Sequence, residues 1–312
     1  MESNIINQKG DIMKSLLVIY NPYSGKKKNI KKLKKEMIKI ASVNDYNIEF
    51  IETKQKDDAT NIMKNIKYYD LVVSMGGDGT FNEVVKGNLQ RKNKLLLSHL
   101  PVGTTNDLKS SFGFSGDTIS IFNSILEGKN VTYDVLSVND TPFTYTAGFG
   151  KFLNIPYETS KKDKSKFGYF AYINNGIIDL FKNGIKLYDI EYEVDGFKQK
   201  AKTPLVLVSN SLKMAGMKFY SNIQLNDGKF EVMIANTNSI IKLAIGILQI
   251  KMGKSSKHFK LVKTNNIKFK INDEIKNWCI DGEKLESNPQ EYNVKIMEKI
   301  KCRVDIKAKN YL

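Results

Sequence analysis

The segment Leu71-Val-Val-Ser-Met-Gly-Gly-Asp-Gly-Thr80 joins a short apolar run to three clustered glycines. Residues 71–75 predict a buried β-strand, and apolar residues at helical spacing begin at Phe81, so the glycines lie in a turn between a strand and a helix N-terminus. Backbone amides at such a terminus, helped by the helix dipole, can bind phosphate. Asp78 lies inside this turn, and a carboxylate beside bound phosphate is best explained by a cation such as Mg²⁺ between them.

Strand and helix patterns alternate through about the first 130 residues. Strands are predicted at residues 16–20, 48–53, 71–75 and 95–100, and helices begin near residues 30, 58 and 81. This order implies parallel strands with right-handed crossovers, and therefore a layered α/β domain. Ligands of such domains bind beyond the carboxyl ends of the strands, where three polar loops are expected to meet: residues 21–25, 76–80 and 103–107.

The pattern changes to β after about residue 131, with alternating apolar residues and Asp-Gly turn pairs. Strands are predicted at residues 131–138, 186–194, 205–208, 230–235, 267–271, 294–297 and 300–306. We therefore expect an α/β domain with a parallel layered sheet over residues 13–134 and an all-β sandwich with inserted helices over residues 135–312. The last residues are expected to return to the N-terminal domain, and residues 1–12 to form a disordered extension.

The composition of the 312-residue chain favours a soluble protein of the cytoplasm. Its most apolar stretch, residues 239–250, is shorter than the ~20 residues that cross a bilayer and predicts one amphipathic helix. The N-terminus shows no secretory signal pattern, and the two cysteines, Cys279 and Cys302, are too few for a disulfide framework. Attachment to the inner face of the membrane and assembly into a homodimer stay open.

The net charge of +16 has three competing explanations: nucleic-acid binding, an anionic membrane surface, or a merely lysine-rich composition. Nucleic-acid-binding folds usually carry a recognisable module, and the sequence has no zinc-finger spacing, RNP-type aromatic motif or basic helix leading into heptads. We therefore expect no specific nucleic-acid partner. Attraction to anionic lipid remains as a secondary role.

Short motifs occur in a fixed order along nearly the whole chain. They are Asn21-Pro22-Tyr23-Ser24-Gly25, Gly76-Gly77-Asp78-Gly79-Thr80-Phe81-Asn82-Glu83, Pro101-Val-Gly-Thr-Thr-Asn-Asp107, Asp134 after a strand, Lys166-Phe-Gly-Tyr-Phe-Ala-Tyr172, Asp227-Gly228 and Asp281-Gly282-Glu283. This ordered set resembles the diacylglycerol kinase catalytic-domain family, specifically its bacterial soluble lipid kinases. The resemblance implies an ATP-dependent kinase with an α/β nucleotide domain, a C-terminal β-sandwich and an active site between them.

The resemblance also implies a role for each matching residue. The implied nucleotide-binding residues are Asn21, Pro22, Tyr23, Ser24, Gly25, Thr53, Gly76, Gly77, Asp78, Gly79, Thr80, Phe81, Asn82, Glu83 and Thr104. Asp78, Asp107 and Asp134 match an acidic trio in a water-bridged network around the catalytic Mg²⁺, and Asp281 and Glu283 match the general base that acts on the acceptor hydroxyl. Asp227, with the carbonyls of Gln224 and Lys229, matches a separate structural Mg²⁺ site.

Each acidic motif has a plainer explanation when it is taken alone. Asp281-Gly282 is typical of a type I′ hairpin turn, as are the two other Asp-Gly pairs of this half. Asp107 is typical of a helix N-cap before Leu108. His99 and His258 have no identifiable partner in the sequence and are expected to be structural.

Three functions therefore compete. The leading one is the ATP- and Mg²⁺-dependent phosphorylation of a lipid hydroxyl, with lipid at the membrane surface as the partner and diacylglycerol, which would become phosphatidic acid, as the expected acceptor. NAD kinase shares the Gly-Gly-Asp-Gly turn, although Asn82, Glu83 and the Asp281-Gly-Glu283 motif favour the lipid branch. The third is a basic membrane-surface or nucleic-acid binding protein with an inactive kinase fold. Residues 108–112 depart from the family pattern and leave the acceptor lipid undefined.

Overall fold

The computed structural model describes residues 13–25, 29–103, 106–150, 185–214, 217–218, 223–273, 278–285, 289–309 and 312. The chain divides into two compact units. The first combines the chain up to Tyr133 with Lys299–Leu312, and the second is Asp134–Glu298. The predicted extension at residues 1–12, the motif at residues 166–172 and Thr104 lie outside the described residues.

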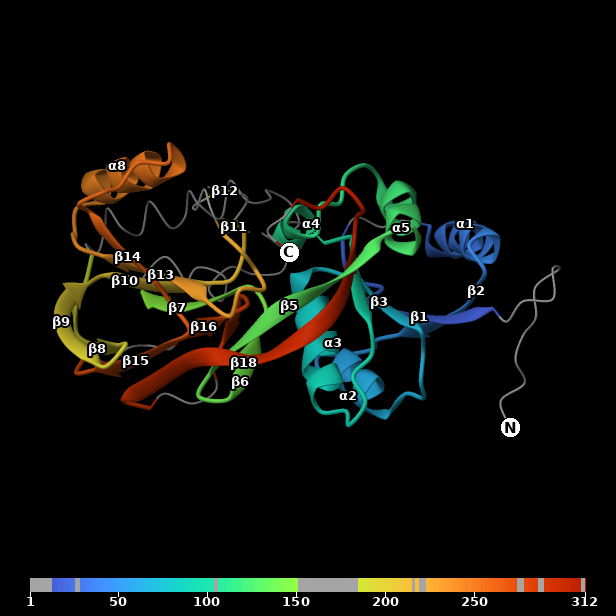
Figure 1. The fold of residues 1–312 in the computed structure, drawn as a ribbon, viewed down its shortest axis with the longest axis horizontal. Helices are drawn as coiled ribbons and strands as arrows, with labels where there is room; N and C mark the ends of the chain where they lie inside the picture. Colours follow the sequence, from blue (N-terminus) through green and yellow to red (C-terminus); the bar gives the residue numbers. More distant parts are fainter. Residues whose placement is uncertain are drawn as a thin grey trace. The chain divides into compact units, whose positions relative to one another are not determined.

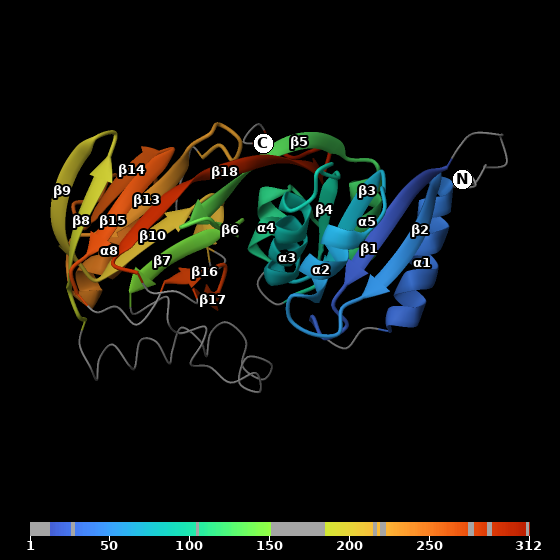
Figure 2. The ribbon, with the colours of Figure 1, turned by 90° about the horizontal axis from the view of Figure 1, so that it is seen from below.

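The first unit is built on a parallel sheet in the order β2-β1-β3-β4, which Figure 2 shows side by side. Its strands are β1 (Lys14–Tyr20), β2 (Tyr46–Glu52), β3 (Leu71–Gly76) and β4 (Leu97–Pro101). The end of β18 (Glu291–Val304) joins the sheet beside β4, with Cys302 opposite Leu97 in parallel register. Every residue of β3 is buried, as expected for a continuous apolar strand with both sheet faces covered.

Helices cover both faces of this sheet, with α1 beside α5 and α2 beside α3 (Figure 1). They are α1 (Ile30–Val43), α2 (Asp58–Asn65), α3 (Asp78–Leu89), α4 (Asp107–Ser111) and α5 (Thr118–Leu126). The Asn29 and Asp117 side chains cap α1 and α5 by accepting hydrogen bonds from the amides of Lys32 and Ser120. The layered α/β architecture predicted from the sequence is confirmed, although the sequence indicates α4 only through the expected N-cap at Asp107 and does not indicate α5.

The second unit contains two packed antiparallel sheets. One has the order β14-β13-β10-β7-β16-β17, and the other contains β18, β15, β8 and β9 with β5 and β6. The strands are β5 (Lys129–Val138), β6 (Thr141–Phe143), β7 (Thr146–Gly150), β8 (Tyr188–Val194), β9 (Phe197–Thr203), β10 (Leu205–Ser209), β13 (Phe230–Ala235), β14 (Phe259–Thr264), β15 (Asn266–Ile271), β16 (Cys279–Ile280) and β17 (Glu283–Lys284). A two-stranded ribbon, β11 (Lys213–Met214) with β12 (Met217–Lys218), and helix α8 (Ile240–Lys251) complete the unit.

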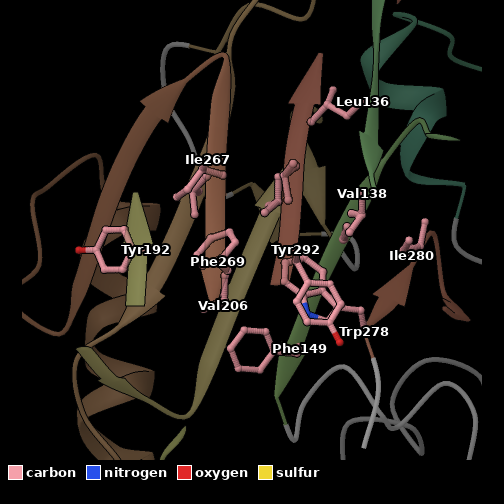
Figure 3. Close-up of a cluster of buried hydrophobic side chains, with 14 of the residues drawn as sticks. Leu136, Val138, Phe149, Tyr192, Val206, Ile267, Phe269, Trp278, Ile280 and Tyr292 are labelled. Carbon is pink, nitrogen blue, oxygen red and sulfur yellow. The ribbon is translucent and has the colours of Figure 1, made fainter. Parts of the chain in front are cut away.

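Apolar side chains from both sheets form the core of the second unit (Figure 3). Trp278 is fully buried and stacks on Tyr292 with ring centroids 4.7 Å apart, and it also contacts Phe149 and Phe269. Aromatic rings of this size contribute most of the apolar area that stabilises such a core. The β-sandwich predicted from the alternating pattern is confirmed.

Two strands predicted at residues 294–297 and 300–306 form the single strand β18. The apolar alternation lapses at Met297, Glu298 and Lys299, all of which are exposed, because the strand there leaves one unit and enters the other. The exposed residues inside this strand therefore led to the prediction of two separate strands. Among the helices that the structure describes, none combines the length and apolar character needed to cross a membrane.

Candidate active site

The glycine turn adopts the predicted strand–turn–helix geometry. Strand β3 ends at Gly76, and Gly77 occupies the N-cap of α3 in an extended conformation. A Cβ atom on Gly76 would lie 2.3 Å from the Thr80 hydroxyl, so this glycine is required by packing. A Cβ atom on Gly79 would meet no atom within 4 Å. The backbone is thus bare at Gly79, in the first turn of α3, where helix amides have no partner within their own helix.

The other two polar loops of the first unit meet this turn. The Asn21 amide donates to the Met75 carbonyl at 3.0 Å, and the Val102 amide donates to the Gly76 carbonyl at 2.8 Å. A Cβ atom on Gly103 would lie 2.7 Å from the Gly77 Cα atom, so the two loops can approach this closely only with a glycine at position 103. The chain leaves β1 toward one edge of the sheet and β3 toward the other, and this switch point is where α/β folds bind ligands.

Asp78 links the glycine turn to the loop before α4. Its carboxylate accepts hydrogen bonds from the amides of Asp107 at 3.1 Å and Leu108 at 3.4 Å, which begin α4. Asp107 itself is 3% exposed. The structure therefore brings two members of the acidic trio together in the first unit, and Asp78 positions the loop that carries Asp107. The N-cap of α4 is Asn106 in a left-handed conformation, so the expectation of Asp107 as the N-cap was wrong by one residue.

His99 lies close to Asp78, a contact that the sequence patterns do not reveal. The ring is fully buried, its Nδ1 shares a hydrogen bond with the Ser74 hydroxyl at 2.8 Å, and its Nε2 lies 3.8 Å from Asp78 Oδ1. Burial lowers the pKa of His99 to about 3, so the imidazole is neutral at physiological pH. The contact follows from the parallel register that places Ser74 beside His99, which no local sequence pattern reveals.

The burial of neutral His99 predicts an acid sensitivity of the metal-free protein. The unfolded chain protonates this ring below a pH of about 6.5, whereas the folded chain protonates it only near pH 3, so stability falls as the pH drops between these values. At pH 5 the loss is roughly 2 kcal/mol relative to pH 7.5. Urea unfolding at both pH values should show a smaller drop for His99→Gln than for the wild type. The partly exposed His258→Asn serves as the matched control and should behave like the wild type; an equal drop in all three proteins would contradict the assignment.

The predicted nucleotide-binding residues before the glycine turn lie in and beside the first loop. Asn21 Oδ1 accepts from the Tyr23 amide at 2.9 Å and shapes the first loop, which also contains Pro22, Ser24 and Gly25. Thr53 is buried beside this loop, with its amide on the Tyr20 carbonyl.

The later residues of the motif turn away from the loops. Phe81 is fully buried against His99 and Phe112, and the Glu83 carboxylate accepts from the Ala59 amide at the start of α2. Asn82 is 5% exposed. Phe81 and Glu83 thus contribute packing and helix capping in this structure, and their contact with nucleotide stays a prediction.

Asp281 and Glu283 lie in a tight hairpin of the second unit. Asp281 (φ 48°) and Gly282 (φ 82°) both have positive φ and join β16 to β17, as expected for a type I′ turn. The Asp281 carboxylate accepts four hydrogen bonds: from the amide and hydroxyl of Thr144 at 2.8 and 3.2 Å, and from the amides of Tyr145 and Thr146, each at 2.9 Å. These donors stabilise the charged carboxylate and fix the turn. Glu283, two residues on, is exposed.

Asp134 is buried in β5 and holds the loop that precedes β13. Its carboxylate accepts from the Gly228 amide at 2.6 Å, and its own amide donates to the Leu225 carbonyl at 2.9 Å. The Asn210 side chain donates to the Asp134 carbonyl at 2.8 Å. Asn210 is a supporting residue that the sequence patterns do not indicate.

The contacts of Asp227 do not fit the predicted structural Mg²⁺. One carboxylate oxygen lies 2.7 Å from the Lys263 ammonium group, and the other accepts from the Lys229 amide at 3.0 Å. Lys263 also lies 3.6 Å from the buried Glu231. Gln224 and Lys229 are exposed. The Lys263 ammonium group therefore already supplies a cation beside Asp227. Within the described residues, no cluster of three or more His, Cys, Asp or Glu side chains is suited to a metal ion.

Replacing Lys263 by methionine should test whether Lys263, and not Mg²⁺, is the cation beside Asp227. The variant leaves the largely buried Asp227 and Glu231 side chains without their cation, so the melting temperature should fall by several degrees, a loss of about 1–3 kcal/mol. Millimolar Mg²⁺ should restore part of the loss in Lys263→Met and leave the nucleotide-free wild type unchanged, as measured by differential scanning fluorimetry. The matched control is Lys202→Met, which breaks the exposed pair with Asp189. It should change neither the melting temperature nor its response to Mg²⁺. A melting temperature of the wild type that depends strongly on Mg²⁺ would contradict the assignment.

The sequence and the fold of this chain are similar to those of known proteins. Residues 15–138 match the diacylglycerol kinase catalytic domain. A diacylglycerol kinase of Staphylococcus aureus strain bovine RF122 / ET3-1 is 30% identical over 248 residues, which cover 78% of this chain and 78% of that protein, and the protein of strain JH9 matches over the same length. The crystal structure of a diacylglycerol kinase from Bacillus anthracis superposes with a TM-score of 0.73 at 18% identity, over 95% of this chain and 98% of that chain.

The structural match supports the fold, and the sequence match extends over most of both proteins. The glycine turn, the two loops that meet it and the Asp281-Gly282 hairpin all occur within a chain of this common architecture. The protein therefore belongs to the diacylglycerol kinase family of lipid kinases.

Proposed function

We propose that this chain transfers the γ-phosphoryl group of ATP to a lipid hydroxyl in the presence of Mg²⁺, with diacylglycerol as the acceptor and phosphatidic acid as the product. The observation that carries the proposal is the bare helix N-terminus at Gly79, with no atom within 4 Å of a Cβ position, at the switch point of a parallel sheet. The Staphylococcus aureus relatives carry the name diacylglycerol kinase, which supports this acceptor over other lipid alcohols.

The nucleotide side of the reaction depends on the first unit. Amides of the Gly76–Thr80 turn would bind phosphate, and the loop at Asn21–Gly25 and Thr53 would flank the nucleotide. The carboxylates of Asp78, Asp107 and Asp134 are hard oxygen donors of the kind that bind Mg²⁺ through its waters. Mg²⁺ in such a network would neutralise charge that develops on the transferred phosphoryl group. Asp78 would then hold the Asp107 loop and the metal waters together.

The acceptor side depends on the hairpin of the second unit. A lipid hydroxyl is a weak nucleophile at neutral pH, so a carboxylate within hydrogen-bond reach would assist by accepting its proton. Asp281 and Glu283 are the carboxylates proposed for this role. The four donors hold the Asp281 carboxylate in place, while Glu283 lies exposed two residues away. We propose that the two residues act as one unit, with Asp281 setting the turn that carries Glu283.

Transfer of radiolabel from [γ-³²P]ATP to dioctanoylglycerol in detergent micelles tests the proposal. Labelled phosphatidic acid should form with Mg²⁺ and should be lost when EDTA is added in excess. A panel with phosphatidylglycerol, a sphingoid base, ceramide and an isoprenoid alcohol should give lower transfer than diacylglycerol. Phosphorylation of NAD in place of every lipid would favour NAD kinase, and failure to bind ATP–Mg²⁺ at millimolar concentration would favour a binding protein with an inactive kinase fold. We further propose that the protein acts in the cytoplasm, with access to the inner face of the membrane.

A further inference from the structure

Helix α8 exposes an apolar stripe on its outer face. Ile241, Ile245, Leu248 and Met252 follow one another at intervals of four, three and four residues, so they lie on one side of the helix. Their exposed fractions are 73%, 45%, 56% and 60%. Large apolar side chains that gather on one exposed face, in contrast to scattered ones, indicate a surface that contacts a partner.

The opposite face of α8 is already used by the fold. Leu243 and Ile250 are buried, and a Cβ atom on Gly246 would lie 2.7 Å from the Phe259 ring at the start of β14. Figure 1 shows α8 beside the end of β14 in the second unit. The helix is therefore anchored through one face, and its stripe is an additional surface that the core of the unit does not need.

The charged residues of the chain segment that contains α8 all have one sign. Between Val232 and Asn272 the chain contains eight lysines and no acidic residue. Lys242 and Lys251 lie roughly a quarter turn to either side of the stripe, given 100° per residue, and Lys254 and Lys257 follow the helix. All four are exposed, and none of them forms an ion pair with another of the residues that the structure describes.

We propose that α8 docks the protein on an anionic lipid bilayer, with Ile241, Ile245, Leu248 and Met252 inserted among the acyl chains and the flanking lysines on anionic headgroups. An apolar face bordered by lysines on both sides is the pattern of helices that lie in the membrane interface. The inference deepens the proposed function, on which it rests, because a lipid kinase that acts on a bilayer substrate needs a surface that holds it there.

Two other partners fit the stripe less well. In a two-fold homodimer, the lysines beside the stripe of one copy would face the same lysines of the other, which opposes association. A nucleic acid would pair with the lysines and leave the apolar side chains exposed to water, since phosphate contacts supply that affinity. A bilayer that contains anionic lipid satisfies both features at once.

The test is co-sedimentation with phosphatidylcholine vesicles, prepared with and without phosphatidylglycerol, using the full chain. The wild type should bind the anionic vesicles, and added salt should weaken the binding. Ile241→Gln with Leu248→Gln should lower the binding constant about tenfold or more, because two apolar side chains no longer enter the acyl region. Lys242→Gln with Lys251→Gln should lower it by about fivefold for each lysine at low salt. The matched control, Val43→Gln with Ile306→Gln, alters two apolar side chains that are 84% and 60% exposed elsewhere and should bind as the wild type does.

Kinase activity on dioctanoylglycerol in detergent micelles separates this inference from the proposed function. All these variants should keep that activity, because none alters a proposed site residue. Equal vesicle binding by the wild type and the Ile241→Gln, Leu248→Gln variant would overturn the docking surface even if the kinase is active. A monomer–dimer shift in that variant by analytical ultracentrifugation, with vesicle binding unchanged, would also overturn it by assigning the stripe to a second copy. Loss of lipid phosphorylation by the wild type would reject the proposed function, whatever the vesicles show.

Discussion

Replacing Gly79 with alanine is expected to leave the fold intact and to remove kinase activity. The added methyl group meets no protein atom within 4 Å, and alanine is favoured over glycine inside a helix by about 1 kcal/mol, so the melting temperature should stay constant or rise slightly. If ATP phosphates approach the bare amides of this turn, the same methyl group stands where they must lie. We expect the activity to fall by about 100-fold or more, because phosphoryl transfer depends on the positioning of these phosphates.

Gly76→Ala serves as the comparison that separates loss of the fold from loss of the phosphate site. A methyl group on Gly76 would lie 2.3 Å from the Thr80 hydroxyl, so that variant should lose stability and activity together. Thermal unfolding, isothermal titration with ATP–Mg²⁺ and the micelle kinase assay on both proteins distinguish damage to the fold from damage to the site. If Gly79→Ala has normal stability, ATP affinity and activity, the turn does not bind the ATP phosphates, and the assignment of the nucleotide site is wrong.

The glycine turn could be predicted from the sequence because its requirements are local. Three glycines between an apolar strand and a helix have few structural explanations, and the parallel order of the strands then brings the loop at Asn21–Gly25 to the same rim. The turn at Asp281-Gly282 was predictable for the same reason, since an Asp-Gly pair is a local hairpin signal.

Contacts that depend on register and packing could not be predicted from the sequence. His99 reaches Asp78 because Ser74 and His99 are neighbours across two parallel strands, and no local pattern encodes that pairing. Lys263 of β14 is paired with Glu231 of β13, and this register brings it to Asp227 in the loop before β13. A resemblance between motifs suggested a metal ion at the position where this chain supplies a lysine. Motif matching thus predicted which loops form the site, while the structure was needed to show what each side chain contacts.

Replacing Asp281 with asparagine is expected to weaken both stability and activity. Each oxygen of the Asp281 carboxylate accepts two hydrogen bonds, at least one of them from a backbone amide. In either orientation, an asparagine side chain would place its NH₂ group against a backbone amide, which cannot accept a hydrogen bond. The loss of a charged acceptor with several donors at a partly buried turn should cost about 2–4 kcal/mol of unfolding free energy. Asp195→Asn is the matched control, because Asp195-Gly196 forms the same type of two-residue turn between β8 and β9, on an exposed edge where asparagine is well tolerated.

The activity of Asp281→Asn should fall by about 10²–10⁴-fold, the range that a general base and its alignment contribute. The assay is made well below the melting temperature of the variant, so that the loss reports on the site and not on unfolding. Glu283→Gln separates the two roles, because Glu283 is exposed and its replacement should lower activity without lowering the melting temperature. If Asp281→Asn is destabilised yet retains full activity, Asp281 is only a turn residue. If Glu283→Gln alone is fully active while Asp281→Asn is inactive, the proton is accepted by Asp281, and the hydrogen bonds that hold it serve to orient the base.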